Sequence, residues 1–547
     1  MSLGTGFPGA TTPEDFARRE LEASAFDRYE QMQVDRSQYI WRGRLVGEAT
    51  IPYLIPFEEG TSTSSEEYIT PKSSIGARGV NNLANKLAMA LMPPGQPFFK
   101  LSMTPFAVME LKQDDDRAKV EMQLSAIEQT VRMEMESTGL RSPLVDALRS
   151  LIITGNALLN VDRDGKARFY RLNQYTVQRD AEGTLLEVVL RQSVAARTLP
   201  PELASLAAQS AVSLPSGQSS PNEDTVDIYT RTVLDRNRYR TWQEMEVIGK
   251  LPGTEYSTRV DEPAWLPLTW TLLAGENYGR GPGEEYQGDL DSNESLQESL
   301  ITGAAASARV ITLVNEGGLT DIEEVAEADN GAVIEGREED IGTIKVDKAA
   351  DLSVAKGVQE NIQSGLAQIF LLTSDNVRDA ERVTAEEIRL LAQELETALG
   401  GVFSRFAVEL QLPLARRYMS ILKRLNKLPS LPKGVVSPEV TTGLPALGRF
   451  ASLQRLDLLL QGIAELFGPA AVEKKIKMDT YIGLRSAELG TDITGLFRTD
   501  EELAQLAQAE HRRQLELQAA APTVNAIAAK QAAGAAQAQE SAQPTAQ

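Results

Sequence analysis

The stretch VTAEEIRLLAQELETALGGVFSRFAVELQLPLARR, residues Val383–Arg417, decides most about the fold. It opens with the pattern of a capping box. The side chain of Thr384 can accept a hydrogen bond from a backbone N–H of the first helical turn, and the side chain of Glu387 can accept one from the backbone N–H of Thr384. Apolar residues then recur at steps of three and four positions, which predicts one apolar stripe along a helix. The residues of this stripe are Ile388, Leu391, Leu395, Leu399, Val402, Phe406 and Leu410.

The same pattern continues to Lys427 but is interrupted twice. Gly400 and Gly401 stand in the middle of the stripe, and Pro413 follows them. Glycine pairs and proline bend a helix rather than extend it, so these three residues are the predicted bend points. A helix of this length would measure about 60 Å. A long, bent, capped helix favours a component of a large assembly over the core of an enzyme.

The chain is acidic, with 77 Asp and Glu against 55 Lys and Arg and a net charge of −22. Proteins that bind nucleic acid tightly show the opposite balance, because their affinity comes from neutralising phosphates. Two interpretations stay open. The acidity serves solubility alone, or it belongs to a surface that faces DNA without retaining it.

Composition also excludes several classes of site. The 547 residues contain no cysteine, so disulfides, thiolate zinc sites and cysteine nucleophiles are absent. We expect no membrane span, since no run of eighteen uncharged apolar residues occurs. The first residues, MSLGTGFPGATTPEDF, have neither a basic nor an apolar region of the kind a signal peptide needs.

Periodicity along the chain predicts helices and strands in blocks. Helices are expected at Pro13–Trp41, Ser73–Leu91, Ala118–Ser137 and Ser142–Leu159. Antiparallel strands are expected at Ala167–Leu172, Tyr175–Asp180, Thr184–Arg191, Val226–Leu234, Arg238–Ile248 and Trp265–Leu272. A helix, a short β insertion, a second helix and a polar loop then lead into the long helix. The fold class is therefore α+β, mainly helical.

Motifs for catalysis or cofactor binding are missing. Both Gly-Lys pairs lack the Ser or Thr of a phosphate-binding P-loop. The stretch Gly279–Gly283, GRGPG, resembles a phosphate-binding loop but fits better a turn that leads into a helix. The single histidine, His511, has no recognisable nucleophile or acid partner. We expect no catalytic residues, no cofactor and no metal site.

Several blocks together resemble the portal proteins, or head-to-tail connectors, of short-tailed, podovirus-type bacteriophages. They lie in order from about residue 30 to residue 450. They are TPKSSIGARGVNNLANKLAMALMPPG (70–95), ALRSLIITGNALL (147–159), FYRLNQYTVQRDAEG (169–183), GENYGRGPGEEYQGDLDSNESLQES (275–299), ERVTAEEIRLLAQELETALGGVFSRFAVELQLPLAR (381–416) and TTGLPALGR (441–449).

The resemblance implies a portal fold with a wing, a helical stem, a small β clip, a long bent helix and a helical crown. The implied boundaries are an N-terminal α/β wing at 1–272, a first stem helix at 273–309, the clip at 310–352, a second stem helix at 353–372, a channel loop at 373–383, the long bent helix and wing return at 384–450, the crown at 451–521 and a disordered Ala/Gln-rich tail at 522–547.

The clip is strongly acidic. Residues 310–352 hold 12 Asp or Glu and 3 Lys or Arg. Nine excess negative charges per subunit, repeated around a ring, would repel phosphates and let DNA pass. The alternative is that these acids face solvent or a basic adaptor protein. The clip acidic candidates are Glu323, Glu324, Glu338, Glu339 and Asp340.

The channel loop carries charges of both signs. Its candidates are Asp375, Arg378, Asp379 and Arg382. One hypothesis is that the two arginines touch passing DNA transiently. The other is that they form salt bridges between neighbouring subunits.

The resemblance implies a function without catalysis. It implies a homo-oligomeric ring, usually of twelve subunits, at one capsid vertex, through which genomic double-stranded DNA is packaged and later ejected. The implied partners are the major capsid and scaffolding proteins, the large terminase during packaging and a tail adaptor afterwards. The chain would belong to the virion and reside in the bacterial cytoplasm during assembly. The alternatives are a nucleic-acid-processing enzyme of the packaging machinery, or another structural protein such as a tail adaptor or scaffold.

Overall fold

The computed structural model describes residues 23–56, 70–94, 97–103, 114–195, 225–308 except 247, 349–372, 385–428 except 400, 439–441 and 449–467, with short pieces at 311–315, 321–327 and 341–344, a few single residues, and parts of 505–515. Contacts divide the chain into two units, Met1–Tyr481 and Ile482–Gln547. Every element described below belongs to the first unit.

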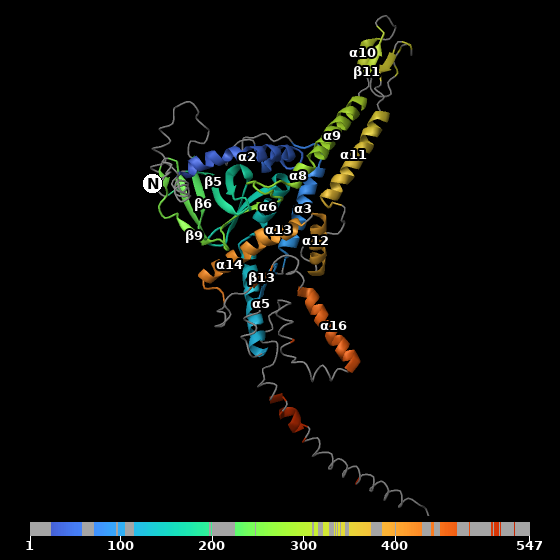
Figure 1. Ribbon diagram of the computed structural model, residues 1–547. Helices are drawn as coiled ribbons and strands as arrows, with labels where there is room; N and C mark the ends of the chain where they lie inside the picture. Colours follow the sequence, from blue (N-terminus) through green and yellow to red (C-terminus); the bar gives the residue numbers. More distant parts are fainter. Residues whose placement is uncertain are drawn as a thin grey trace, which may run out of the picture. The chain divides into compact units, whose positions relative to one another are not determined.

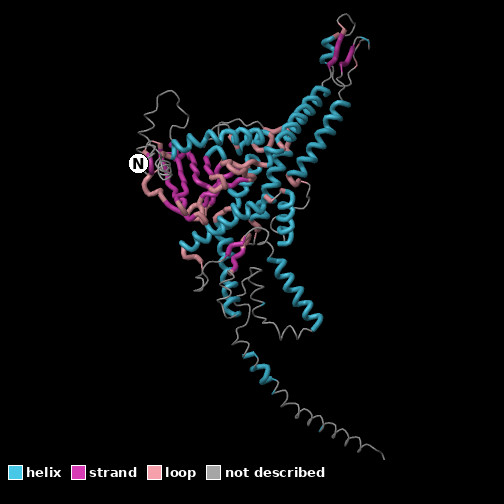
Figure 2. The backbone as a smooth tube through the Cα atoms, viewed as in Figure 1, coloured by secondary structure: helices cyan, strands magenta, loops and turns pink. Residues whose placement is uncertain are grey.

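The first unit is built from long helices and antiparallel strands (Figures 1 and 2). Its helices are α2 (Ala25–Glu48), α3 (Ile75–Leu91), α5 (Asp114–Ser137), α6 (Arg141–Thr154), α8 (Pro282–Glu285), α9 (Gln287–Ala308), α10 (Ile322–Glu327), α11 (Ala349–Ile369), α12 (Ala385–Ala398), α13 (Val402–Phe406), α14 (Leu412–Arg424) and α16 (Arg449–Phe467). Its strands are β1 (Lys100–Ser102), β2 (Asn156–Val161), β3 (Ala167–Tyr170), β4 (Tyr175–Arg179), β5 (Leu185–Ala195), β6 (Thr225–Asp235), β7 (Arg238–Met245), β8 (Gly249–Lys250), β9 (Tyr256–Arg259), β10 (Trp265–Thr269), β11 (Ile311–Val314), β12 (Ile341–Ile344) and β13 (Glu439–Thr441). The α+β class predicted from the sequence is confirmed.

The largest sheet has the order β4-β5-β6-β7, with both β8 and β9 paired to β7. Helix α2 packs along this sheet and contacts four of its strands (Figure 1). A second sheet, β10-β2-β3, packs against α6, and β2 is buried along its whole length. One hydrophobic core joins this second sheet to α3, α6, α13 and α14.

The prediction of a helix over Ser142–Leu159 is wrong in its last part. Helix α6 ends at Thr154, because Gly155 adopts a left-handed backbone with φ 75° and its N–H closes the final turn onto Leu151. Asn156 instead begins strand β2, which pairs with both β10 and β3. A short apolar run such as this fits a buried strand as well as a helix, and only its two strand partners decide between them.

The predicted long helix is divided into separate segments. Helix α12 ends at Ala398, and Gly401 has φ 90°. Helix α13 then runs through a π-helical turn, Ala407–Gln411, directly into α14. In a regular α-helix the ring of Pro413 would clash with the carbonyl of Glu409. The π-helical turn, which is wider than an α-helical turn, lies just before Pro413 and includes Glu409. Gly400 and Thr384 lie outside the described residues.

The boundaries of the helical hairpin also differ from those predicted. The first expected stem segment, from residue 273, contains a loop, the short helix α8 and then α9. Helix α11 begins at Ala349 rather than at residue 353. Among the described residues, no helix has the length and apolar character needed to cross a bilayer.

Candidate functional site

The helices α9 and α11 pack side by side as a hairpin (Figure 1). Their contact is polar. The side-chain amide of Gln359 donates to Gln297 at 2.5 Å, and that of Gln363 donates to Asn293 at 3.1 Å. Buried amides must find partners, so this ladder fixes the register of the two helices.

Three apolar side chains of the hairpin face outward, whereas Leu352 of α11 packs against Gly303 of α9. Ile301, Val354 and Val358 are 52%, 69% and 47% exposed. The hairpin therefore presents apolar surface that another protein surface would cover.

The base of the hairpin is fixed to α3. Asn82 donates to the carbonyl oxygens of Phe370 and Leu371 at 3.0 and 2.9 Å, and Lys86 donates to Leu371 at 2.8 Å. These bonds satisfy carbonyls at the end of α11 that have no partner within the helix. Burial lowers the pKa of Lys86, an effect that the carboxylate of Glu394 opposes.

Two further contacts hold the hairpin in place. Gly79 lies against Phe370, where a Cβ atom would come within 2.5 Å of the ring. The carboxylate of Glu294, on α9, accepts from the backbone N–H groups of Lys72 and Ser73 at 2.8 and 2.9 Å. Helix α12 packs on α3 as well. Both sides of the segment 373–384 are thus anchored on the same helix.

The far end of the hairpin carries the small acidic insertion predicted as the clip. Strands β11 and β12 pair antiparallel, and α10 lies between them in sequence. The predicted candidates Glu323, Glu324 and Glu339 are exposed there. Glu338 and Asp340 lie outside the described residues.

The other predicted site residues are placed only in part. Asp375, Arg378, Asp379 and Arg382 lie outside the described residues. Gly401 stands at the break before α13, and Pro413 at the start of α14. In the described part of the chain, no group of three or more His, Cys, Asp or Glu residues could hold a metal ion.

The loop Gly279–Gly283 forms a turn that packs on the end of α6. Asn156 binds the backbone of Gly279 in both directions: its amide donates to the carbonyl at 2.8 Å, and its side-chain oxygen accepts from the N–H at 2.7 Å. Gly155 and Gly281 are in close contact, since a Cβ atom on Gly155 would come within 2.4 Å of the nitrogen of Gly281. The loop joins the second sheet to the hairpin. The N–H of Gly279 already donates a hydrogen bond to the side chain of Asn156.

A buried ionic cluster was not predicted from the sequence. The carboxylate of Glu187, on β5, accepts from Arg28 of α2 at 2.6 Å and from Arg231 of β6 at 2.6 Å. All three side chains are buried. The cluster joins α2 to the large sheet. Its members are 159 and 44 residues apart in sequence, so no local pattern could have indicated the pairing.

The family model for "Bacteriophage head to tail connecting protein" matches residues 22–496. The chain belongs to this family of phage head-to-tail connecting proteins. It is 38% identical to the portal protein of Enterobacteria phage T3, over 88% of this chain and 89% of that protein. It is 37% identical to the portal protein of Escherichia phage T7, over 88% and 90% of the two chains.

A more distant relative is the portal protein of Pseudomonas phage phiKMV, with 31% identity over 87% of this connector and 91% of that protein. Among solved structures, a chain in the virion of a native gene transfer agent particle aligns with 76% of this chain and 90% of its own length. Its identity is 12% and its TM-score 0.33, too low to carry an argument. The family resemblance predicted from the sequence is confirmed.

Proposed function

We propose that this connector is the portal subunit of a short-tailed bacteriophage. Copies of it form a ring, expected to contain twelve subunits, at one capsid vertex. Genomic double-stranded DNA enters the capsid through the ring and later leaves through it. The observation that carries the proposal is the match to portal proteins of T3 and T7 along nearly the whole chain. The protein acts as a conduit and docking platform, without a catalytic step.

The implied partners follow from this position in the virion. The capsid and scaffolding proteins would surround the ring during assembly in the host cytoplasm. The large terminase would dock during packaging, and a tail adaptor would replace it. The match to portal proteins favours this function over an enzyme of packaging or a separate tail protein.

The outward apolar faces of α9 and α11 support ring formation. In a ring, the hairpin of one subunit lies beside that of its neighbour, which would cover Ile301 and Val354. Burying one such side chain contributes about 1.5–3 kcal/mol. If two buried apolar side chains were replaced by charged ones, the association constant of the interface would fall by more than about a hundredfold.

The ring can be tested by electron microscopy and mass measurement of the purified protein. The unaltered chain should form rings with a central hole wide enough for duplex DNA, and the variant I301D/V354D should dissociate. Met133→Asp is the matched control, because Met133 is 53% exposed on α5, outside the hairpin. A stable monomer of the unaltered chain would remove the ring proposal. Intact rings of I301D/V354D would show that the hairpin faces do not hold the ring.

The acidic insertion and the channel loop are proposed to act on the passing DNA. Exposed carboxylates such as Glu323 and Glu324 would repel phosphates, so that the conduit does not retain them. A basic adaptor docking on these acids is the competing interpretation. Arg378 and Arg382 are proposed to contact DNA transiently from the loop between α11 and α12.

We expect the variant R378A/R382A to assemble normally but to change the length of genome that is packaged and retained, because the loop would lose its contacts with phosphates. Pulsed-field electrophoresis of DNA from the particles measures this length. Asp375→Ala is the control from the same loop. Normal packaging and retention would remove the DNA-contact role. Rings that fall apart would assign the arginines to salt bridges between subunits.

A further inference from the structure

Three helices of the first unit, α5, α11 and α14, end in the same hydrogen-bond pattern. Just past each helix, a residue with positive φ donates its N–H to the carbonyl three residues earlier, and the next residue donates to the carbonyl five residues earlier. This is the Schellman motif, whose left-handed residue is usually glycine and sometimes asparagine. That residue is Gly139 after α5, Asn426 after α14 and Leu371 after α11, with φ 69°, 53° and 53°.

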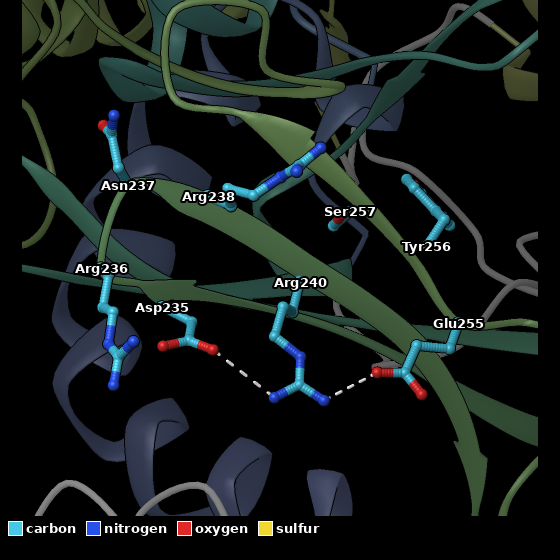
Figure 3. Close-up of a pocket in the computed structure, with 8 residues that line it drawn as sticks. All are labelled: Asp235, Arg236, Asn237, Arg238, Arg240, Glu255, Tyr256 and Ser257. Carbon is cyan, nitrogen blue, oxygen red and sulfur yellow. Dashed lines mark hydrogen bonds and ion pairs between the residues drawn. The ribbon is translucent and has the colours of Figure 1, made fainter.

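Leu371 is the exception among the residues with positive φ. In the described part of the chain three non-glycine residues have a positive φ, and two of them have a local reason. Arg236 lies in the two-residue turn between β6 and β7, a kind of turn that requires this backbone (Figure 3). Asn426 is of a residue type that tolerates it. A leucine prefers the helical backbone by about tenfold, so Leu371 by itself would not end α11 here.

The end of α11 is held from outside the helix, by one face of α3. Gly79, Asn82 and Lys86 recur at steps of three and four positions, so they lie on the same face. Asn82 and Lys86 together donate three hydrogen bonds to the carbonyl oxygens of Phe370 and Leu371. Gly79 leaves room for the ring of Phe370, which is fully buried. Helix α3 thus stabilises a backbone that the sequence of α11 disfavours.

The other two helix ends have no such support. Among the described residues, no side chain donates to the carbonyl oxygens at the matching positions, Thr138 and Gly139 after α5 and Leu425 and Asn426 after α14. Where the left-handed residue is glycine or asparagine, the motif stands alone. Where that residue is leucine, a neighbouring helix supplies three hydrogen bonds. The residue at which α11 ends therefore depends on the position of α3.

We propose that the end of α11 is a two-state element, kept in a held state by Asn82 and Lys86 of α3. In the held state Leu371 is left-handed and the chain turns away from the helix axis after Phe370. In the released state Leu371 takes the helical backbone, which leucine favours, and the chain leaves α11 in another direction. A displacement of α3 relative to α11 would break the three hydrogen bonds and release the helix end.

The position of this element gives the release a consequence. It lies at the start of the segment 373–384, so its state sets the direction from which the chain enters that segment. Helix α12, which follows the segment, packs on α3 as well, so a shift of α3 would act on both sides. An effect on DNA passage rests on the proposed portal function, whereas the two states of the helix end are a property of each subunit alone.

The test is electron paramagnetic resonance of a spin label on the full-length protein. Because the chain has no cysteine, the variant Gln368→Cys takes a single label, on an exposed residue one turn before the helix end. We expect one main spectral component from the held state. Asn82→Ala removes two hydrogen bonds and should raise the ratio of released to held state by about tenfold or more.

The deciding variant is N82A/L371G with the same label. Glycine takes the left-handed backbone without strain and disfavours continuation of the helix. We therefore expect the spectrum to return to the held component, although the hydrogen bonds from Asn82 are still missing. A change at position 371 could not repair damage to α3 itself, so this rescue separates the two-state element from a merely structural role of Asn82.

The matched control is Asn426→Leu at the end of α14. It places leucine in the same motif without a supporting helix. The label is carried by Lys423→Cys, since Lys423 is exposed and holds the position that Gln368 holds in α11. We expect a released component in Asn426→Leu and one held component in the chain with asparagine at this position.

Three results would overturn the proposal. An unchanged spectrum in Asn82→Ala would show that α3 does not hold the end of α11. A spectrum of N82A/L371G that resembles Asn82→Ala would show that the left-handed leucine is not what makes the hydrogen bonds necessary. A single held component in Asn426→Leu would show that leucine carries no penalty in this motif. The label reports on each subunit, so these results stand whether or not the protein forms rings.

Discussion

Replacing Glu187 by alanine is expected to destabilise the large sheet and its helix α2 by about 3–5 kcal/mol. The variant leaves Arg28 and Arg231 buried without their shared carboxylate, since the side chains of these arginines are only 8% and 0% exposed. An unpaired buried charge is among the most destabilising changes a fold can receive. Thermal unfolding and limited proteolysis at α2 would measure the effect.

The control for Glu187→Ala is an exposed ion pair in the same sheet. Glu255 binds Arg240 at 2.7 Å with 59% of its side chain exposed, so Glu255→Ala should cost less than about 1 kcal/mol. Equal effects of the two substitutions would show that the buried cluster adds nothing beyond a surface pair. A variant that replaces all three charged residues by apolar ones of similar size should recover much of the loss.

Replacing Gly155 by alanine is expected to have an effect of similar or greater size, above about 4 kcal/mol. Two penalties combine at this position. The backbone has φ 75°, and a Cβ atom would lie 2.3 Å from the carbonyl carbon of Arg280. The loop Gly279–Gly283 would have to move, and with it the start of the hairpin. Loss of folded protein, or a large drop in the unfolding temperature, would be the measured result.

A matched control separates the two penalties. Gly253 has φ 78°, almost the same backbone, but nothing lies within 4 Å of its added Cβ. Gly253→Ala should therefore cost only the backbone term, about 1–2 kcal/mol. If both alanine variants behaved alike, the close approach of the loop to α6 would have no energetic weight.

Sequence patterns predicted the helices and strands well where the residues that stabilise an element lie close to it in sequence. The run Ser73–Leu91 corresponds to α3, and the strand–turn–strand pattern around Asp180–Gly183 corresponds to β4 and β5. The turn is closed by Asp180, whose carboxylate accepts from the N–H groups of Glu182 and Thr184. Aspartate and glycine in such a turn act through contacts two to four residues away, so the sequence alone reveals them.

Sequence patterns failed to predict an element where the strand or helix that pairs with it lies far away in sequence. Nothing near Asn156–Leu159 shows that β10, about a hundred residues later, will pair with it. The amides that join α9 to α11 look like ordinary solvated positions on two separate helices. Nor does the sequence of either helix show that Ile301, Val354 and Val358 will be exposed.

The sequence by itself determined the α+β class, the order of helix, small insertion and second helix, and the family to which the chain belongs. It also predicted bends at Gly400, Gly401 and Pro413, of which Gly400 lies outside the described residues. These properties follow from steric and periodic rules that act over a few residues. Only the tertiary structure decided that the helix breaks at Gly401 but passes Pro413 through a π turn. The structure alone also showed that Glu187 joins α2 to the sheet and that α3 anchors both α11 and α12. Such contacts join residues tens to hundreds of positions apart, and burial and close packing, rather than local propensity, select them.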